Sequence, residues 1–513
     1  MTPHPVGPDE LGPDHVDLSI SARVLADKLP AGFVVGAATS SYQVEGAVHA
    51  DGRGPSVWDT WLRDRSVTVD RSTADDAVDH YRRMPQDVAL MGELGLDAYR
   101  FSVAWPRIFP DGGSRPNRRG LDFYHRLLDE LEQHGLAPML TAFHWDTPQH
   151  LEDDGGWMSR DTALRFADYA AVLGREYGER VRWWCTINEP ATVAGNGYGS
   201  ELHAPARNAG VGALRAAHHL LLGHGLSVQA LRAEGVRGAI GMSNVHSPAE
   251  PANPDSVLDR AAAEVIETAT NRLFADPVLL GTYPTAVHAA ARVAGLKIRD
   301  GDLETISQPL DFYGLNYYMP TLVAAGSGDD GPLPASLVLP SGGDAEGGRS
   351  PLHIVEWPDV RRTAYGWPVV PDHLGVMLAR MRDRYPDLPP VYITEGGASF
   401  DESPGPDPET GVVQVHDTRR AEYLGDHLTA ALDAVGPGGH AEGVDLRGYF
   451  VWTLMDNWEW AAGYRQTFGL VHVDRATMAR TPKASYHWLR KVLQHRRRQE
   501  TPAKSTAAGA ATA

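Results

Sequence analysis

The sequence predicts an α/β chain folded as a (β/α)8 TIM barrel, a single domain with long βα loops. Two observations support this. Short apolar runs rich in β-forming residues alternate with amphipathic helical stretches along almost the whole chain. Each run is apolar on both faces, as expected of a parallel sheet covered by helices. The eight predicted strands are Phe33–Ser40, Ala98–Val103, Ala137–His144, Arg182–Glu189, Arg237–Asn244, Leu310–Tyr318, Val391–Gly396 and Tyr449–Met455.

The segments between the predicted strands show helical periodicity. Apolar residues from Tyr81 to Leu94 recur three or four positions apart, and Gly95 follows as a helix end. The stretch from Leu121 to Leu131 repeats this pattern before Gly135. An open doubly wound sheet is the competing architecture, but the glycine-rich phosphate-binding turn that it requires does not follow the first strand.

Length and local composition suggest where the domain begins and ends. A chain of 513 residues can bury a large core as one barrel and still carry long loops. We expect residues 1–29, rich in Pro and Asp, to form a loose N-terminal extension and 496–513 a disordered C-terminal tail, leaving 30–495 for the barrel. The Gly-, Ser- and Pro-rich segment 324–349 predicts either a long excursion at a pocket rim or disorder.

Charge and cysteine content limit the partners. A formal net charge of -19 disfavours nucleic acid and anionic membranes, so a neutral small molecule fits best. The single cysteine, Cys185, lies in an apolar run and is expected to be buried. The N-terminus lacks signal-peptide character, and no run reaches the roughly 18 apolar residues of a membrane span. We therefore expect a cytoplasmic protein, monomeric or homo-oligomeric.

Polar and aromatic residues concentrate at the C-terminal ends of the predicted strands, where barrels of this type build their sites. The N-terminal strand ends carry no comparable density. The residues at or just after the C-terminal ends include Gln43, Glu45, His144, Trp145, Asp146, Asn188, Glu189, Asn316, Tyr318, Glu395, Trp452, Asp456, Asn457, Glu459 and Trp460. The site is therefore predicted at this end of the barrel.

Arg100 is unusual because it lies within an otherwise apolar strand, Ala98–Val103. An unpaired guanidinium would be costly there, so Arg100 must face a carboxylate if it points inward. It forms either a structural ion pair inside the barrel or a pair that keeps a catalytic carboxylate ionised.

Two glutamates, Glu189 and Glu395, end strands on different sides of the barrel and can face each other across its mouth. Glycoside hydrolysis requires two carboxyl groups, a general acid to protonate the leaving oxygen and an ionised partner. A separation of about 5–5.5 Å predicts retention of configuration, and about 6.5–9.5 Å predicts inversion. The pattern therefore indicates a glycoside hydrolase of either stereochemistry.

Sugar binding requires aromatic faces for the C–H groups of a pyranose and polar groups for its hydroxyls. Each tryptophan at the strand ends, taken singly, is more simply explained by core packing, but the set favours a sugar site. The predicted sugar-binding residues are Gln43, His144, Trp145, Asn188, Trp452, Glu459 and Trp460.

Six motifs between Phe33 and Leu489 make the chain resemble glycoside hydrolase family 1, the β-glucosidase and β-galactosidase family. Thr186–Pro190 is similar to the family's acid/base motif, and Ile393–Gly397 to its nucleophile motif. The other four motifs are Phe33–Gly46, Tyr99–Ser102, Trp105–Arg107 and His144–Pro148.

The resemblance implies a role for each site residue. Glu189 would be the acid/base and Glu395 the nucleophile, supported by Arg100, Tyr318 and Asn316. The glycone hydroxyls would be held by Gln43, His144, Asn188, Glu459 and Trp460, beside Trp145, with Trp452 as the stacking platform. Family members need no metal or organic cofactor. We expect Glu189 to remain protonated near neutrality, because burial and the Glu395 anion both raise its pKa.

The expected activity is that of a retaining β-glycosidase. It would release terminal β-D-glucosyl residues, and also β-galactosyl or β-fucosyl residues, from small β-glycosides or short oligosaccharides such as those of cellulose degradation. A buried Glu459 anion is expected to repel the phosphate of a 6-phosphosugar. Glu189 is a true acid, unlike the glutamine of thioglucosidase relatives, which favours O-glycosides.

Two positions depart from the family pattern. Gly396 replaces the usual Asn after the nucleophile, so a side-chain hydrogen bond is lost although the turn is permitted. Ala191 replaces the usual Trp after Asn-Glu-Pro, which is expected to widen the aglycone side.

Three other functions are weaker hypotheses. A non-catalytic sugar-binding barrel is the main alternative, disfavoured because both glutamates and Arg100 are present. A metal-dependent hydrolase is suggested by His218, His219 and His224, but these lack the i, i+4 spacing of a helical metal pair. The segment Gly195–Gly199 is an incomplete dinucleotide-binding motif and is expected to be a loop beside the pocket.

Overall fold

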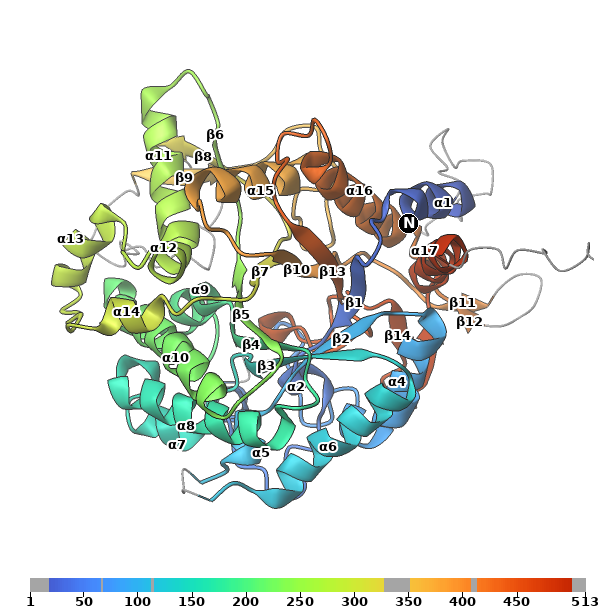
Figure 1. Cartoon of the computed structure of the whole chain (residues 1–513), viewed down its shortest axis with the longest axis horizontal. Helices are drawn as coiled ribbons and strands as arrows, with labels where there is room; N and C mark the ends of the chain where they lie inside the picture. The colour runs from blue at the N-terminus through green and yellow to red at the C-terminus, as the bar shows by residue number, and fades with distance from the viewer. Residues whose placement is uncertain (1–17, 66–67, 112–114, 327–350, 407–412, 501–513) are drawn as a thin grey trace, which may run out of the picture.

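The computed structural model describes residues 18–65, 68–111, 115–326, 351–406 and 413–500 (Figure 1). Its core is built of eight parallel strands, β1 (Val34–Ala38), β2 (Ala98–Ser102), β3 (Ala137–Phe143), β4 (Trp183–Asn188), β5 (Ala239–Val245), β7 (Tyr313–Asn316), β10 (Val391–Gly396) and β13 (Leu446–Trp452). They close into a barrel in the order β1-β13-β10-β7-β5-β4-β3-β2. The predicted (β/α)8 barrel is confirmed.

Each predicted apolar run overlaps one of these strands, but some strand ends differ from expectation. β13 begins at Leu446, three residues before the predicted start, and stops at Trp452, where the chain leaves the sheet. β7 is confined to Tyr313–Asn316. The apolar runs continue into buried loops at the barrel mouth. An apolar run therefore predicts which residues are buried, but not the last residue that is hydrogen-bonded to a neighbouring strand.

Helices surround the barrel, and the helical periodicity placed two of them correctly. α4 (His80–Leu94) ends at Gly95, whose φ of 87° is the left-handed conformation that glycine adopts readily. α6 spans Arg118–Gln133 before Gly135. The other long helices are α8 (Arg160–Tyr177), α10 (Leu214–Ala233), α15 (Asp372–Arg384), α16 (Thr418–Val435) and α17 (Ala484–Glu500).

Shorter elements follow the strands at the barrel mouth or lie on the outside. The helices among them are α2 (Ser41–Val44), α3 (Val57–Arg65), α5 (Trp105–Ile108), α7 (Gln149–Asp153), α9 (Pro190–Thr192), α11 (Val257–Glu267), α12 (Leu273–Leu279), α13 (Thr285–Val293) and α14 (Asp302–Ile306). The strands are β6 (Ala249–Pro251), β8 (Thr321–Ala325), β9 (Leu352–Val355), β11 (Gly405–Pro406), β12 (Val413–Gln414), β14 (Val471–Val473) and β15 (Arg480–Pro482).

Both chain ends correct the sequence-based boundaries. Within the predicted N-terminal extension, residues 18–28 form helix α1 (Leu18–Lys28), which buries Leu25 and lies beside α17, so the expectation of a loose end is wrong there. α17 continues to Glu500, and Arg496 pairs with Asp97 beside β2, so residues 496–500 belong to a helix rather than to a tail. Residues 1–17 and 501–513 lie outside the described residues.

The segment 324–349 is largely outside the described residues as well. Its described start belongs to β8, which pairs antiparallel with β9 and parallel with β6 in a small sheet beside the barrel.

Large side chains fill the barrel interior. Trp183, Phe312, Tyr392 and Phe450 form one buried cluster inside the ring of strands. Since this cluster packs the interior below the strand ends, open space near the barrel axis occurs above it, at the C-terminal ends.

Candidate active site

A cavity of about 670 Å³ lies at the C-terminal ends of the barrel strands. It is lined by eight of the twelve residues that were assigned roles in the site from the sequence, namely His144, Trp145, Glu189, Tyr318, Glu395, Trp452, Glu459 and Trp460. The other four, Gln43, Arg100, Asn188 and Asn316, are buried and contact the lining residues.

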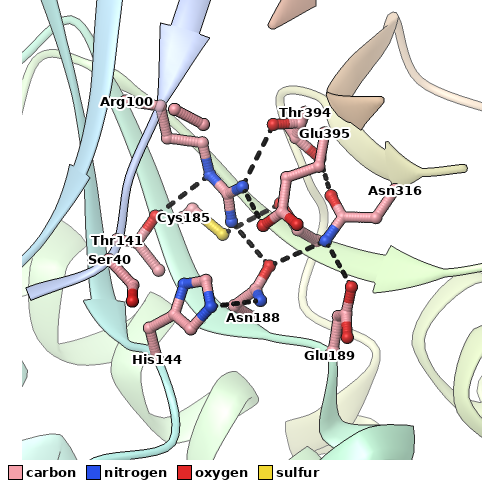
Figure 2. Close-up of polar contacts among 12 residues, drawn as sticks. Ser40, Arg100, Thr141, His144, Cys185, Asn188, Glu189, Asn316, Thr394 and Glu395 are labelled. Atoms are coloured by element: carbon pink, nitrogen blue, oxygen red, sulfur yellow. Dashed lines mark hydrogen bonds and ion pairs between the residues drawn. The ribbon is translucent and has the colours of Figure 1, made fainter. Parts of the chain in front are cut away.

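Glu395, the penultimate residue of β10, accepts two hydrogen bonds. Arg100 Nη1 donates to Oε1 at 2.6 Å (Figure 2). The Tyr318 hydroxyl donates to Oε2 at 2.7 Å. The carboxyl group is buried, and one of its two hydrogen-bond donors is the guanidinium cation of Arg100, so the pair is a charge-assisted hydrogen bond.

Arg100 is held in place by partners on three other strands. Its Nη2 donates to Asn188 Oδ1 at 2.6 Å, its Nε to Thr141 Oγ1 at 3.2 Å, and its Nη1 also to the Thr394 carbonyl at 3.1 Å. Figure 2 shows the guanidinium at the centre of this network. Of the two readings of Arg100, the one in which it faces a cavity-lining carboxylate matches this geometry.

Glu189, at the end of β4, has neutral partners instead. Asn316 Nδ2 donates to Oε1 at 2.8 Å, and Thr192 Oγ1 donates to Oε2 at 2.8 Å. Burial, followed by the nearby charge of Glu395, raises the pKa of Glu189 to about 7. The pKa of Glu189 is thus raised, and for the two causes expected from the sequence.

The two glutamates are connected by a short chain of side chains. Asn316 Nδ2 donates both to Glu189 and to Asn188 Oδ1, which also accepts from the Arg100 guanidinium bound to Glu395. Thr394 Oγ1 fixes the Asn316 carboxamide by donating to its oxygen at 2.7 Å. Both carboxyl groups therefore belong to one hydrogen-bonded unit and face one cavity.

Three lining residues adopt left-handed backbone conformations that non-glycine residues rarely take. The φ angles are 74° at Trp145, 48° at Glu189 and 49° at Trp460. Such conformations cost roughly 1–3 kcal/mol each and persist where the surrounding structure imposes them. At Glu189 this turn comes directly after β4 and before Pro190, which starts α9, so it sets the direction of the carboxyl group.

Gln43 and Glu459 form a second polar pair. Gln43 Nε2 donates to Glu459 Oε2 at 3.1 Å and to the Trp458 carbonyl at 3.0 Å. Burial and the charge of Glu395 raise the pKa of Glu459 to about 8. The expected Glu459 anion is therefore wrong for neutral pH, because a third carboxyl group beside two others is held protonated. Repulsion by a Glu459 anion therefore does not explain why a 6-phosphosugar would be excluded at neutral pH.

His144 and the tryptophans complete this end of the cavity. His144 Nε2 lies 3.1 Å from Asn188 Nδ2, and its ring stacks against Trp452 with centroids 5.9 Å apart. Burial lowers the pKa of His144 well below its usual value, so the ring is neutral. Trp145 Nε1 donates to the Asn188 carbonyl at 3.1 Å.

Several lining residues were not predicted, because they belong to loops and short elements outside the barrel strands. Thr192 had a usable signal, since it follows Glu189 by three residues at the start of a helix. Asn196 lies in the Gly195–Gly199 segment, which was expected beside the pocket. Other lining residues belong to no motif, among them Val69, Leu202, His203, Thr270, Thr321, Tyr365, Trp367 and Phe468.

The two departures from the family pattern have different structural settings. A Cβ atom at Gly396 would lie 2.3 Å from the Tyr449 hydroxyl oxygen, so Tyr449 occupies the space that a side chain there would need. Ala191 is buried and does not line the cavity, although the nearby Thr192 and Asn196 do. The expected widening of the aglycone side is therefore not located at Ala191 itself.

The histidines and the glycine-rich segment that suggested a metal site and a dinucleotide site belong to helices of the fold. His218, His219 and His224 are buried in α10 and contact Asp302, the Trp157 carbonyl and Thr186 respectively. Gly195–Gly199 is part of a π-helical turn, not the expected loop, and places Asn196 at the cavity. Cys185 is buried.

Within the described ranges, no group of three or more His, Cys, Asp or Glu side chains is arranged to hold a metal ion. In the same part of the chain, none of the helices is both long and apolar enough to cross a membrane.

Comparisons with known proteins agree with this geometry. A bifunctional β-D-glucosidase/β-D-fucosidase from Bifidobacterium breve is 40% identical over 475 residues, covering 90% of this chain and 98% of the relative. A thermostable β-glucosidase B from Thermobispora bispora is 44% identical over 91% of this chain and 90% of its own.

Solved structures give the same result. A psychrophilic β-glucosidase from Micrococcus antarcticus matches with a TM-score of 0.83 and 40% identity over 93% of this chain and 99% of its own. A family 1 β-glucosidase from Thermotoga maritima matches with a TM-score of 0.81 and 39% identity, over 91% of this chain and 98% of its own. The model of glycosyl hydrolase family 1 matches residues 25–498, and the chain belongs to that family of glycoside hydrolases.

Proposed function

We propose that this glycoside hydrolase is a retaining β-glycosidase in which Glu395 is the nucleophile and Glu189 the acid/base. One observation carries the assignment: two carboxyl groups line a single cavity, and only Glu395 has a cationic partner, Arg100. The group that attacks must be ionised, and the group that protonates the leaving oxygen must be neutral.

In the first step, Glu395 attacks the anomeric carbon while Glu189 donates its proton to the glycosidic oxygen. The aglycone leaves, and the sugar is bound covalently to Glu395. Because the ester carries no charge, the electrostatic effect that raises the pKa of Glu189 is removed. Glu189 is then a carboxylate and accepts a proton from water, which attacks the anomeric carbon and releases the sugar with its β configuration.

The glycone is proposed to lie at the closed end of the cavity, against Trp452 and the polar pair of Gln43 and Glu459. Since Glu459 is protonated near neutrality, its carboxyl group both donates and accepts hydrogen bonds to sugar hydroxyls. His144 and Trp460 complete this group, with Asn188 supporting it from below.

β-D-Glucosides are the proposed substrates, with β-fucosides and β-galactosides also accepted, because the relatives with similar sequences are named for glucosidase and fucosidase activity. The described lining of the cavity holds no Lys or Arg side chain, so nothing there would pair with the phosphate of a 6-phosphosugar. Short oligosaccharides from cellulose are within this substrate class.

The setting of the reaction is also proposed from charge and composition. A net charge of -19 disfavours nucleic acid as a partner. A single cysteine requires no oxidising compartment, which is in keeping with a cytoplasmic location. A monomer and a homo-oligomer are equally compatible with a site built from one chain.

The stereochemistry of the first product tests the proposal. We expect proton NMR during hydrolysis of 4-nitrophenyl β-D-glucoside to show β-glucose before α-glucose appears by mutarotation. Initial α-glucose would contradict the double displacement. If no nitrophenyl β-glycoside in a panel of glucoside, galactoside and fucoside is hydrolysed, the non-catalytic sugar-binding alternative is favoured.

A further inference from the structure

The cavity changes character between its closed end and its mouth. At the closed end, Glu395 and Trp452 are each 3% exposed. At the mouth, two lining residues are large, apolar and exposed: Val69 at 59% and Leu202 at 50%. Because exposed large hydrophobic side chains have no partner in the free protein, those at the entrance of a binding cavity are candidates for ligand contact.

The two residues come from separate loops and are fixed beside the sugar-binding residues. Val69 lies between α3 and α4, and its amide donates to the Ala461 carbonyl at 2.9 Å, next to Trp460. Leu202 precedes His203, whose ring lies 5.6 Å from Trp145. Burial lowers the pKa of His203 to about 4, so its ring is neutral near pH 7.

More apolar surface lines the cavity on the side of β7 and β10. Tyr365 and Trp367 stack with centroids 4.6 Å apart and an interplanar angle of 6°, and Trp367 lies 5.5 Å from Tyr318. Met319 and Phe468 also belong to the lining. A flat or flexible apolar group entering the mouth would therefore meet hydrophobic side chains from several loops.

Three polar side chains of the cavity lining, Ser247, Thr321 and Thr270, are already hydrogen-bonded within the protein. Ser247 Oγ donates to the Met319 carbonyl at 2.6 Å and lies 2.9 Å from Thr321 Oγ1, and Thr270 Oγ1 donates to the Ile266 carbonyl at 2.8 Å. A second sugar would bring several hydroxyl groups that need partners, and each one left unsatisfied on burial costs binding free energy.

The Asn196 carboxamide, which also lines the cavity, differs from these three side chains. The side-chain oxygen of Asn196 is buried without a hydrogen-bond partner within the described part of the chain. An amide oxygen can accept at most two hydrogen bonds, which serves one or two hydroxyls and is fewer than the hydroxyls of a second sugar require.

We propose that the apolar mouth formed by Val69 and Leu202 selects β-glycosides whose aglycone is an alkyl or aryl group over those whose aglycone is a second sugar. The proposal rests on the proposed function, which places the glycone at the closed end, so that whatever lies beyond the scissile bond extends to the mouth. It identifies the substrate class and two residues that determine it.

Alkyl β-D-glucosides of increasing chain length, compared with cellobiose, test the proposal. An alkanol is a poorer leaving group than a sugar hydroxyl, so a preference for the alkyl series reflects binding rather than reactivity. A fully buried methylene contributes about 0.8 kcal/mol, or about fourfold. For half-covered methylenes, we expect kcat/KM to rise about twofold per methylene from butyl to octyl glucoside, and to exceed that for cellobiose.

Two near-isosteric substitutions assign the effect to the mouth. Val69→Thr and Leu202→Asn should each lower kcat/KM for octyl glucoside about threefold, and together about tenfold, while leaving cellobiose hydrolysis within twofold of wild type. Val413→Thr and Leu164→Asn are matched controls, because these residues are similarly exposed, at 50% and 48%, but do not line the cavity.

The outcomes separate the two proposals. Equal losses for octyl glucoside and cellobiose in the mouth variants, or higher kcat/KM for cellobiose in the wild type, would overturn the apolar-mouth proposal and leave the glycosidase intact. If wild-type protein hydrolyses neither substrate, the proposed function itself fails.

Discussion

Glu189 directly follows strand β4 and Glu395 is the penultimate residue of β10, and both line the same cavity, yet the two carboxyl groups have different surroundings. Glu395 accepts hydrogen bonds from the Arg100 guanidinium and the Tyr318 hydroxyl, whereas Glu189 is bound by the neutral Asn316 and Thr192. An adjacent cation favours the charged form, while burial next to another carboxylate favours the neutral form. Identical side chains thus acquire different chemistry from their neighbours.

The largest expected effect comes from removing the charged member. Glu395→Gln keeps the size of the side chain but removes the nucleophile, so kcat for 4-nitrophenyl β-D-glucoside should fall at least about 1,000-fold. Steady-state kinetics measure this, with circular dichroism as a check of folding. Activity within tenfold of wild type would reject Glu395 as the nucleophile.

Removing the neutral member should give a loss that depends on the substrate. Glu189→Ala should retain glycosylation by substrates with good leaving groups, since these depart without a proton, and then accumulate the glycosyl-enzyme. Azide fits the space left by the carboxyl group and should restore turnover by about tenfold or more, as an order-of-magnitude expectation for a replaced general base. The product should be β-glucosyl azide.

Azide provides the control as well, because Glu395→Gln has no glycosyl-enzyme to release and should not respond to it. Rescue of both variants, or of neither, would contradict the division of roles between the two glutamates.

The same contrast should appear in stability. Glu395→Gln leaves the Arg100 guanidinium buried without its anion, and we expect this to lower the free energy of unfolding by on the order of 2 kcal/mol. Breaking a buried ion pair typically costs more than this. The loss is smaller here because the substitution also removes a negative charge that repels the Glu189 and Glu459 carboxyl groups. Glu189→Gln should instead stabilise the protein at alkaline pH, by about 2–3 kcal/mol at pH 8.

The pH dependence follows from the raised pKa of Glu189. The folded protein holds this proton more tightly than the unfolded chain, so ionisation destabilises the fold progressively from about pH 4.5 to about pH 7 and fully above. Thermal unfolding should therefore show Glu189→Gln melting above wild type at pH 8, with most of the difference gone at pH 5. A lower melting temperature at pH 8 would mean that the Glu189 carboxylate is stabilised by its surroundings.

Much of the fold was predictable because buried parallel strands produce continuous apolar runs between helices. Helix α1 was missed although Ala22, Leu25, Ala26 and Leu29 carry helical spacing, because the Pro- and Asp-rich residues before them suggested a loose end. Strand ends such as that of β13 were displaced because pairing partners, not local sequence, determine where a ladder stops.

The closed end of the cavity was more predictable than its mouth for a related reason. Residues such as Asn188 and Glu189 sit at strand ends, whose positions the barrel fixes. Val69 and Leu202 reach the cavity through loops, whose paths depend on tertiary contacts such as that between Val69 and Ala461. The protonation of Glu459 was missed because it depends on desolvation and on the distance to two other carboxyl groups.

The smallest expected effect isolates Glu189 from the other titrating groups. Loss of the acid proton should lower kcat/KM as pH rises through about 7, but Glu459, with its pKa of about 8, titrates nearby. Thr192 donates a hydrogen bond to Glu189 Oε2, and this bond lowers the pKa of Glu189. Thr192→Val should therefore move the alkaline limb upward, by up to about half a pH unit for a bond worth about 0.7 kcal/mol.

Thr270→Val is the matched control for this shift. Thr270 also lines the cavity, but its hydroxyl donates to the Ile266 carbonyl and not to a carboxyl group, so its removal should leave the alkaline limb in place. Glu459 has no contact with Thr192 among its described hydrogen bonds, so a limb governed by Glu459 would stay near pH 8 in both variants. An upward shift in Thr192→Val alone identifies Glu189 as the acid whose proton limits the reaction, whereas equal profiles would transfer that role to another group.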